Sequence, residues 1–423
     1  MKKIFSVAII GCGSRGANAY GRQMFKEKDK FRVVALCDIV ESALKTAATA
    51  LEIENENCFT SEDAFFAKKR ADVLVIATQD RDHVWMCVKG MQLGYDVLLE
   101  KPISPEKEEL YALLEAQKKY NKKVLVCHVL RYAPAFVKIK EFLDSGAIGK
   151  LVRMEAVENV AYWHQAHSFV RGNWRREQDT SPMIMQKCCH DLDLIQYYVG
   201  SRCESVYSVG ELSFFNRENQ PDGAAGRCAD CEYILTCPYS AERLYVQRFK
   251  ANSCSQSWPY DVVDNSRPIT EKSLRTAYEK GPYGRCVFAC DNDVVDNQTV
   301  DMYFENGVKA TLTMTAFTYY QGRRYVFHGT YGELELDEQT HTIRLSVYGR
   351  ENEIFDTREI IKQYMQDNFG HGGGDYCLVQ SFYEVLSEET PIQTGLEASI
   401  ESHLIAVAAE QSRKNGEIVK VHG

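Results

Sequence analysis

Three glycines directly after the first apolar run could bring the backbone close to a phosphate. In "VAIIGCGSRG", Gly11, Gly13 and Gly16 form a GxGxxG pattern that opens a helix. The first glycine permits a tight turn, the second lets the backbone approach a pyrophosphate, and the third lets helix and strand pack closely. The helix N-terminus then offers free N–H groups to the phosphates. The pattern predicts a dinucleotide site, and a plain glycine turn is the alternative.

An acidic residue closes the second apolar run, in "VVALCDIV". Asp38 could accept hydrogen bonds from the two hydroxyls of an adenosine ribose, and it would repel a 2′-phosphate. We therefore expect NAD to bind in preference to NADP, although Arg15 and Arg22 place positive charge near the same turn. A solvated aspartate without a ligand is the alternative.

An acid, a base and a proline stand at the end of another apolar run. In "YDVLLEKPIS", Glu100, Lys101 and Pro102 follow Val97–Leu99 with no polar spacer. A strand that ends in a solvated loop does not need this trio. A surface lysine after a strand is the simplest interpretation, and a lysine that takes part in a reaction is the other.

Cysteines gather in one later stretch of the chain. "RCADCEYILTCPY" contains Cys228, Cys231 and Cys237, and "GRCVFACDN" adds Cys286 and Cys290. Two cysteines separated by two residues, with a third nearby, have the spacing of a tetrahedral zinc site or of an iron–sulfur cluster. With Cys286 as the expected fourth ligand, a bound metal, expected to be structural zinc, would help this stretch to fold. Reduced thiols in a mobile flap are the alternative.

The elements that must position these residues alternate regularly at the start of the chain. Apolar, β-rich runs lie between helical stretches, which predicts βαβ units and a parallel sheet. The first domain is therefore expected to be an α/β Rossmann domain that binds the dinucleotide, over residues 1–127. The expected strands are Phe5–Ile10, Val33–Cys37, Val73–Ala77, Val97–Leu99 and Lys123–Cys127, and the clearest helices are Ser61–Lys69, His83–Leu93 and Pro105–Tyr120.

Beyond residue 127 the strand signals follow one another closely. Period-two patterns with short turns, such as "FENGVKATLTMTAF", indicate antiparallel pairing. Residues 128–423 are predicted to form an α+β domain with a large, mostly antiparallel open sheet and a cysteine-rich insertion at about residues 215–297. Its helices are expected at Met183–Tyr198, Tyr376–Leu386 and Glu397–Asn415.

Composition and charge exclude several classes of partner. Of the 423 residues, 45% are hydrophobic and 26% charged, as in ordinary globular proteins. The net charge of −9 argues against nucleic acid as a partner, and no apolar run is long enough to span a membrane. The start "MKKIFSVAIIG" is typical of a first strand rather than an export signal. We therefore expect a cytoplasmic protein whose 15 cysteines are mostly reduced.

Five motifs, taken in order along the chain, resemble the Gfo/Idh/MocA oxidoreductases, a family that includes glucose–fructose oxidoreductase and inositol dehydrogenase. They are "GCGSRG", "VIATQDRDHV", "GYDVLLEKPIS", "LRYAPAF…SGAIGKLV" and "CCHDLDLIQYYVG". The resemblance covers most of the chain except the insertion. It implies an NAD(P)-dependent dehydrogenase acting on CH–OH groups, which assembles as a homodimer or homotetramer through its open second sheet.

The resemblance also implies two catalytic residues. Lys101 is expected beside the nicotinamide, where it would hydrogen-bond the reacting substrate oxygen and exchange a proton. His190 matches the family's general base, and Asp193 follows three residues later on the same helix face. Many family members have an aspartate four residues before this histidine, where this chain has Gln186. That departure indicates a substrate different from that of inositol dehydrogenase.

Further site residues follow from the same match, or from side chains suited to sugars, since aromatic faces stack on sugar rings and polar groups bond hydroxyls. The expected cofactor-binding residues are Gly11, Gly13, Ser14, Arg15, Gly16, Asp38, Ala77, Thr78, His83, Glu100, Lys101, Trp174 and Arg175. The expected substrate-binding residues are Arg131, Tyr162, His164, Arg171, Lys187, Asp193 and His371. For Lys187 an ion pair with Asp191 is the alternative.

Together these features predict an NAD-dependent oxidoreductase that transfers a hydride between the nicotinamide and a ring carbinol carbon of a sugar, cyclitol or glycoside. One alternative is a redox-neutral enzyme that keeps its NAD, oxidises a glycoside transiently and eliminates the glycosidic group. Another alternative is a dinucleotide-binding regulator without catalysis. The presence of Lys101 and His190 argues against the regulator, whereas Gln186 leaves it open.

Overall fold

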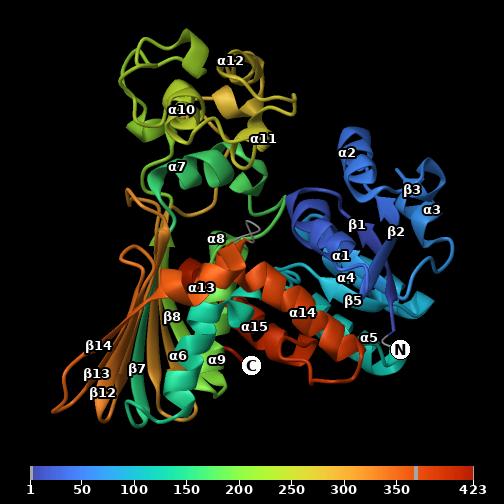
Figure 1. The fold of residues 1–423 in the computed structure, drawn as a ribbon. Coiled ribbons are helices and arrows are strands. Elements are labelled where there is room, and N and C mark those ends of the chain that lie inside the picture. Colours follow the sequence, from blue (N-terminus) through green and yellow to red (C-terminus); the bar gives the residue numbers. More distant parts are fainter. Residues whose placement is uncertain (1–2, 366–369, 423) are drawn as a thin grey trace.

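Two separate β-sheets and an insertion make up the computed structural model, which describes residues 3–365 and 370–422 (Figure 1). The six-stranded sheet is parallel throughout, in the order β3-β2-β1-β4-β5-β6. Its order reverses between β1 and β4, which is where open α/β sheets bind their ligands. Its strands are β1 (Phe5–Ile10), β2 (Phe31–Cys37), β3 (Cys58–Phe59), β4 (Val73–Ile76), β5 (Asp96–Leu99) and β6 (Val124–Val126).

Helices cover both faces of this sheet, so its central strands are apolar along their whole length. The four residues of β4, for example, are all buried. These helices are η1 (Ser14–Gly21), α1 (Arg22–Lys26), α2 (Glu41–Leu51), α3 (Glu62–Phe66), α4 (His83–Leu93) and α5 (Lys107–Tyr120). The predicted Rossmann domain is therefore confirmed, and α4 has the predicted bounds.

The nine-stranded sheet follows in the order β14-β13-β12-β11-β7-β10-β9-β8-β15. Within this sheet, β7 and β10 are the only described strands that pair in parallel, so the mostly antiparallel open sheet is confirmed. Buried and more exposed residues alternate along β9 and β10, because one face packs on helices. The strands are β7 (Leu151–Asn159), β8 (Cys203–Glu211), β9 (Asn297–Phe304), β10 (Lys309–Thr315), β11 (Gly322–Gly329), β12 (Gly332–Asp337), β13 (Thr342–Val347), β14 (Glu353–Asp356) and β15 (Val419–Lys420).

The helices of the second half differ from the prediction in one place that matters for the site. A single helix was expected over Met183–Tyr198, but the structure breaks it at Lys187 and Cys188 into α8 and α9. The break lies directly before His190. The helices outside the insertion are α6 (Pro134–Asp144), α7 (Tyr162–His164), η5 (Gln165–Arg171), η6 (Asn173–Arg175), α8 (Met183–Gln186), α9 (Cys189–Val199), α13 (Thr357–Met365), α14 (Gly374–Leu386) and α15 (Leu396–Asn415).

The insertion between β8 and β9 stands apart from both sheets, above α7 in Figure 1. We expected it to be irregular, yet it contains η9 (Glu242–Gln247), α10 (Arg248–Ala251), α11 (Tyr260–Val263) and α12 (Glu271–Lys280). Its aromatic and aliphatic side chains form a hydrophobic cluster of their own. This second core explains how the segment folds beside the sheets rather than as a flap.

The end of the chain returns to the Rossmann sheet, where α14 and α15 run between the two sheets (Figure 1). The Val126 amide of edge strand β6 donates to the Thr394 carbonyl at 2.8 Å, and Leu125 forms a β-bridge with Gly395. The expected division after residue 127 therefore falls just beyond a strand whose outer edge is completed by C-terminal residues. None of the described helices has the length and apolar character needed to cross a membrane.

Candidate active site

The glycine-rich turn joins β1 to η1 at the carboxyl edge of the six-stranded sheet. Gly11 has a φ of +89°, and a Cβ there would lie 2.3 Å from the Ala77 carbonyl oxygen. A Cβ on Gly16 would lie 1.9 Å from the Gly11 carbonyl oxygen, whereas one on Gly13 would meet nothing within 4 Å. Two of the glycines are thus required by packing, and the third leaves the backbone open to a ligand. This is the arrangement that a pyrophosphate requires.

Asp38 lies beside this turn, at the end of β2. Its Oδ2 accepts a hydrogen bond from the Cys12 amide at 2.7 Å, and its Oδ1 accepts one from the Val40 amide at 2.8 Å. The carboxylate is only half-buried and retains lone pairs for further donors. Its position fits the ribose hydroxyls of a dinucleotide whose phosphates lie on Gly13.

Arg15 links the glycine turn to two other segments rather than extending into solvent. Its Nε donates to Glu100 Oε1 at 2.7 Å, and its Nη2 lies 2.8 Å from Asp375 Oδ1. The Tyr20 hydroxyl also donates to Glu100, at 2.6 Å. Burial raises the pKa of Glu100, but Arg15 and Lys101 outweigh burial and lower it below its ordinary value. Glu100 is therefore ionised, and it links the glycine turn to the turn that carries Lys101. Neither Tyr20 nor the place of Asp375 in this network was identified from the sequence.

The turn that carries Lys101 is held from several sides. The Lys101–Pro102 peptide is cis, and the Pro102 carbonyl accepts a hydrogen bond from His83 Nδ1 at 2.7 Å. The Ile103 amide donates to His403 Nε2 at 2.8 Å. Since the Lys101 amide also donates to Glu100 Oε2 at 2.8 Å, little freedom remains in the turn. His83 therefore supports the turn from the start of α4.

His403 fixes this turn from α15, a role that sequence reasoning did not find. Its Nδ1 donates to the Ser399 carbonyl at 2.8 Å, which leaves Nε2 as the acceptor for Ile103. Burial, together with His128, lowers the pKa of His403 to about 3. The imidazole is therefore neutral at physiological pH, as its acceptor role requires. No short motif distinguishes this histidine within the helix.

The junction of α8 and α9 lies near both predicted catalytic residues, because Lys101 contacts the last residue of α8 and His190 is the second residue of α9. Lys101 Nζ donates to the Gln186 carbonyl at 3.3 Å, one turn before His190. Burial lowers the pKa of His190 well below its ordinary value, and Lys101, His128 and His371 lower it further. A neutral imidazole beside an ammonium group can accept a proton, which suits a general base.

Two further histidines surround His190. The His128 and His371 rings each lie 6.0 Å from it, measured between ring centroids. His371, an expected substrate residue, also places Nδ1 3.2 Å from Asp375 Oδ1. The His371 side chain thereby connects the carboxylate that holds Arg15 to the surroundings of His190. His128 was not found from the sequence, because no spacing rule relates it to α9.

The expected substrate residues Arg131 and Asp193 are instead paired with each other. Arg131 Nε lies 2.7 Å from Asp193 Oδ2, and Nη2 lies 2.6 Å from Oδ1. Both side chains are almost fully buried. Each charge therefore already has a partner within the chain, and contact of these two residues with substrate stays a prediction.

Lys187 pairs with a residue other than the expected Asp191, and its contact with substrate stays a prediction. Its Nζ lies 3.0 Å from Glu158 Oε1 on β7, rather than near Asp191. Asp191 accepts hydrogen bonds from Arg323 Nε at 2.9 Å and from the Tyr325 hydroxyl at 2.5 Å. The break between α8 and α9 turns Lys187 away from the helix face on which it would meet Asp191.

Gln186, the departure from the family pattern, has a buried partner that the sequence did not indicate. Its Nε2 donates to Asp80 Oδ2 at 2.8 Å, and the Ser181 hydroxyl donates to the same oxygen at 2.7 Å. Asp80 belongs to the motif "VIATQDRDHV", in which Ala77 and Thr78 lie beside the glycine turn. The Gln186 side-chain amide therefore connects the second domain to the Rossmann domain at Asp80.

The remaining expected residues lie toward the insertion. Arg175 pairs with Asp291 in two contacts of 2.7 and 3.0 Å, and Trp174 packs against Phe169. These contacts place Arg175 in an ion pair with the insertion, and its contact with a cofactor stays a prediction. The Tyr162 ring lies 6.0 Å from that of Tyr239, and the His164 ring 5.0 Å from that of Trp258, measured between ring centroids.

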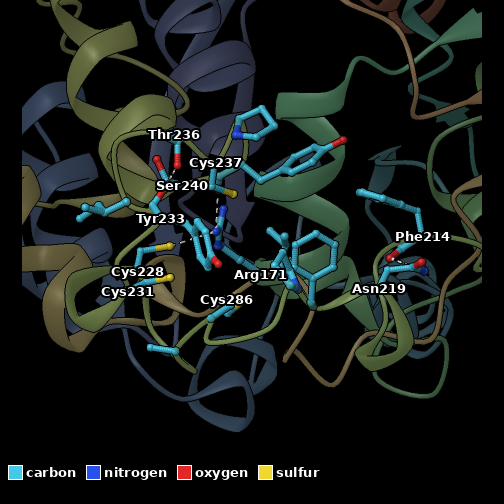
Figure 2. Close-up of a pocket in the computed structure, with 18 residues that line it drawn as sticks. Arg171, Phe214, Asn219, Cys228, Cys231, Tyr233, Thr236, Cys237, Ser240 and Cys286 are labelled. Atoms are coloured by element: carbon cyan, nitrogen blue, oxygen red, sulfur yellow. Dashed lines mark hydrogen bonds between the residues drawn. The ribbon is translucent and has the colours of Figure 1, made fainter.

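Arg171 and the four cysteines lie together in a pocket of the insertion (Figure 2). Arg171 Nε donates to the Arg285 carbonyl at 2.7 Å, and the substrate role of Arg171 stays a prediction. Among residues 3–365 and 370–422, no three His, Cys, Asp or Glu side chains are arranged to hold a metal ion. The arrangement of the described side chains therefore gives no support to the predicted zinc site.

Two family models together match most of the chain. A family model described as "Oxidoreductase family, NAD-binding Rossmann fold" matches residues 5–128, and one described as "Oxidoreductase family, C-terminal alpha/beta domain" matches residues 140–421. YteT of Bacillus subtilis (strain 168) is 28% identical over 335 residues, which are 76% of this chain and 75% of that protein.

A second relative and a solved structure extend this comparison. The 2,7-anhydro-N-acetylneuraminate hydratase of Mediterraneibacter gnavus is 24% identical over 208 residues, 49% of this chain and 53% of that protein. Levoglucosan dehydrogenase in complex with NADH and L-sorbose has the same fold, with a TM-score of 0.72 at 16% identity over 100% of this chain and 99% of that one.

Proposed function

The chain belongs to the Gfo/Idh/MocA oxidoreductase family, and from that premise we propose that it transfers a hydride between NAD and a ring carbinol carbon of a sugar, cyclitol or glycoside. The observation that supports the proposal is the contact of Lys101 with the Gln186 carbonyl, four residues before His190, together with the lowering of the His190 pKa by burial and by the positive charge of Lys101. Gly13 and Asp38 support NAD as the cofactor, because one is open to a pyrophosphate and the other suits a ribose.

The residues divide the proton chemistry between them. When bound, the nicotinamide supplies the hydride acceptor. Neutral His190 takes the proton of the substrate hydroxyl, since its lowered pKa keeps it unprotonated at neutral pH. The Lys101 ammonium stabilises the oxygen as negative charge develops there. The contacts of Glu100, His83 and His403 keep the Lys101 turn in place during this transfer.

A redox-neutral reaction is the second candidate. Its support is the hydratase relative, whose name describes addition of water rather than net oxidation. Retained NAD would then accept the substrate hydride transiently and return it at the end of the cycle, while Lys101 and His190 would move the hydroxyl proton and a second proton from the carbon beside the ketone. The regulator without catalysis has no comparable support.

A reaction in deuterated water separates the two enzymes. The protein is incubated with NAD and a panel of polyols, sugars and glycosides, while NADH absorbance and product are followed together. Net oxidation predicts that NADH rises in step with product. Deuterium next to the former ketone carbon, with no accumulation of NADH, would contradict net oxidation and support the redox-neutral cycle.

Self-assembly is part of the same proposal. Large apolar side chains are exposed on strands of the nine-stranded sheet, namely Val152, Tyr207, Val209, Tyr303 and Ile354. Burying them would lower the free energy of association by about 25 cal/mol per Å² of apolar surface. Light scattering of the purified protein should report a dimer or tetramer, and a monomer at all concentrations would contradict this part of the proposal.

A further inference from the structure

The pocket of the insertion is an unusual place for four cysteines. It encloses about 410 Å³ between η5 and the loops of the insertion, and most of its lining is apolar. Cys228, Cys231, Cys237 and Cys286 all line it, as Figure 2 shows. They come from two segments that are joined by a β-bridge between Arg227 and Arg285. The fold therefore brings distant cysteines to one cavity that catalysis does not use.

N–H groups donate toward these sulfurs. The Ala241 amide donates to Cys228 Sγ at 3.4 Å, and Arg171 Nη2 donates to the same atom at 3.5 Å. The backbone of Tyr239 hydrogen-bonds Cys237, and that of Phe288 hydrogen-bonds Cys286. Hydrogen bonds to sulfur stabilise metal-bound thiolates and tune iron–sulfur clusters. Reduced thiols in a flap would not need them.

Arg171 supplies a buried positive charge to the same cavity. Only 1% of its surface is exposed, and its Nη1 has no hydrogen-bond partner. Its other contacts are the carbonyls of Arg285 and Tyr239, the sulfur of Cys228 and the Tyr245 side chain. Within the described part of the chain, no carboxylate lies within ion-pair distance of its guanidinium. A buried charge without a partner is costly, so an occupant of the cavity should be negatively charged.

The cysteine spacing allows either a single zinc ion or an iron–sulfur cluster, and the size of the cavity favours the cluster. No three of the thiols in the described residues converge on a single ion. The space of about 410 Å³ also far exceeds the roughly 10–15 Å³ that a single water needs on the same measure. An occupant that reaches all four sulfurs must therefore be larger than one metal ion.

We propose that Cys228, Cys231, Cys237 and Cys286 hold an iron–sulfur cluster of the [4Fe–4S] type, with Arg171 balancing its charge. Each thiol loses a proton and binds one iron, so the site gains the negative charge that the guanidinium needs. The cluster joins the loop of residues 228–237 to the loop of residues 286–288. Hydride transfer at Lys101 does not involve it.

Iron and sulfide analysis tests the site directly. Protein purified without oxygen or chelator should contain about four iron and four sulfide per chain. It should also show an electron paramagnetic resonance signal after reduction with dithionite. Cys231→Ser and Cys286→Ser should each lose most of the iron. Cys290→Ser is the matched control and should keep it, because Cys290 does not line the cavity.

Three results would overturn the proposal. They are the absence of iron even after reconstitution with ferrous iron and sulfide, one zinc per chain in its place, or full iron content in both cysteine variants. NAD binding to each variant shows whether the rest of the chain is folded, because the glycine turn is remote from the insertion in sequence. Metal content does not depend on turnover, so failure here leaves the proposed function untouched.

A second pair of variants tests the role of Arg171. Arg171→Met removes the positive charge beside the cluster and should make its reduction potential more negative, since net charge sets this potential. Arg171→Lys keeps the charge and should shift the potential less. Equal potentials in the wild type and Arg171→Met would show that the guanidinium does not face the cluster.

Discussion

The buried arginines of the active-site region have carboxylate partners, whereas Arg171, the buried arginine of η5 that faces the pocket of the insertion, has none among the described residues. Arg131 is matched to Asp193, and Arg323 contacts both Asp191 and Glu158. Arg171 contacts backbone carbonyls and a sulfur atom instead. The first region is therefore neutralised by the chain itself, and the second retains a charge for a bound group. A buried arginine therefore indicates an anionic ligand only when no carboxylate of the chain neutralises it.

The largest effect is expected from breaking a matched pair. Arg131→Met leaves the Asp193 carboxylate buried without a partner, which should lower the free energy of unfolding by about 3–5 kcal/mol. The double variant Arg131→Met with Asp193→Leu should recover most of this loss, because both charges are gone. Denaturant unfolding measures each variant. Arg153→Met, at a surface pair with Glu155, is the control and should change far less.

The next effect concerns turnover rather than stability. Lys101→Met and His190→Ala should each reduce kcat by about two orders of magnitude or more, the usual contribution of a positioned acid–base group. NAD affinity should stay nearly constant, because neither side chain holds the glycine turn. Lys118→Met, on the surface of α5, is the control. Undiminished turnover in both active-site variants would place the proton path elsewhere.

The next prediction concerns Asp38 and the preference for NAD over NADP. Asp38→Ala should weaken NAD binding by about 1–3 kcal/mol, since hydrogen bonds to a charged group are lost. It should also improve NADP binding, because the repulsion of the 2′-phosphate disappears. Titration with both dinucleotides measures the ratio of their affinities. Asp38→Asn keeps the shape of the side chain and separates loss of charge from loss of volume.

The smallest effect is a pH dependence of stability. The pKa of His403 is about 3 in the folded protein, because of burial, and about 6.5 in an unfolded chain. As pH falls below about 6.5, the unfolded state therefore binds a proton that the folded state does not, and stability declines by at most about 1.4 kcal/mol per pH unit. His403→Gln should remove the part of this decline in unfolding free energy that comes from protonation of His403 in the unfolded state. Unfolding at pH 7 and pH 5 measures it.

The parallel sheet and the glycine turn could be predicted because local patterns determine them. Phe5–Ile10 and His83–Leu93 have the bounds expected from apolar runs and helix signals. Gly11 is required because it lies against Ala77 at the end of the neighbouring strand β4, and Gly16 is required because it lies against Gly11. The GxGxxG spacing encodes both contacts.

The partners of the buried charges could not be predicted, because they come from distant parts of the sequence. Asp80 and Gln186 are 106 residues apart, and Arg15 and Asp375 are 360 apart. Lys187 could reach Asp191 only on a continuous helix, and the break between α8 and α9 removes that contact. Helix spacing describes neighbours along an element and carries no information on contacts made across the molecule.

The return of the chain to β6 has a consequence for synthesis on the ribosome. Residues 1–126 emerge first, but the Thr394 carbonyl that accepts from Val126 emerges only when most of the chain has been made. Asp375, which holds Arg15 at the glycine turn, is equally late. The nascent Rossmann sheet therefore exposes an unpaired edge strand until translation is nearly complete. A truncated N-terminal domain should consequently aggregate or require a chaperone, whereas the full chain covers its own edge.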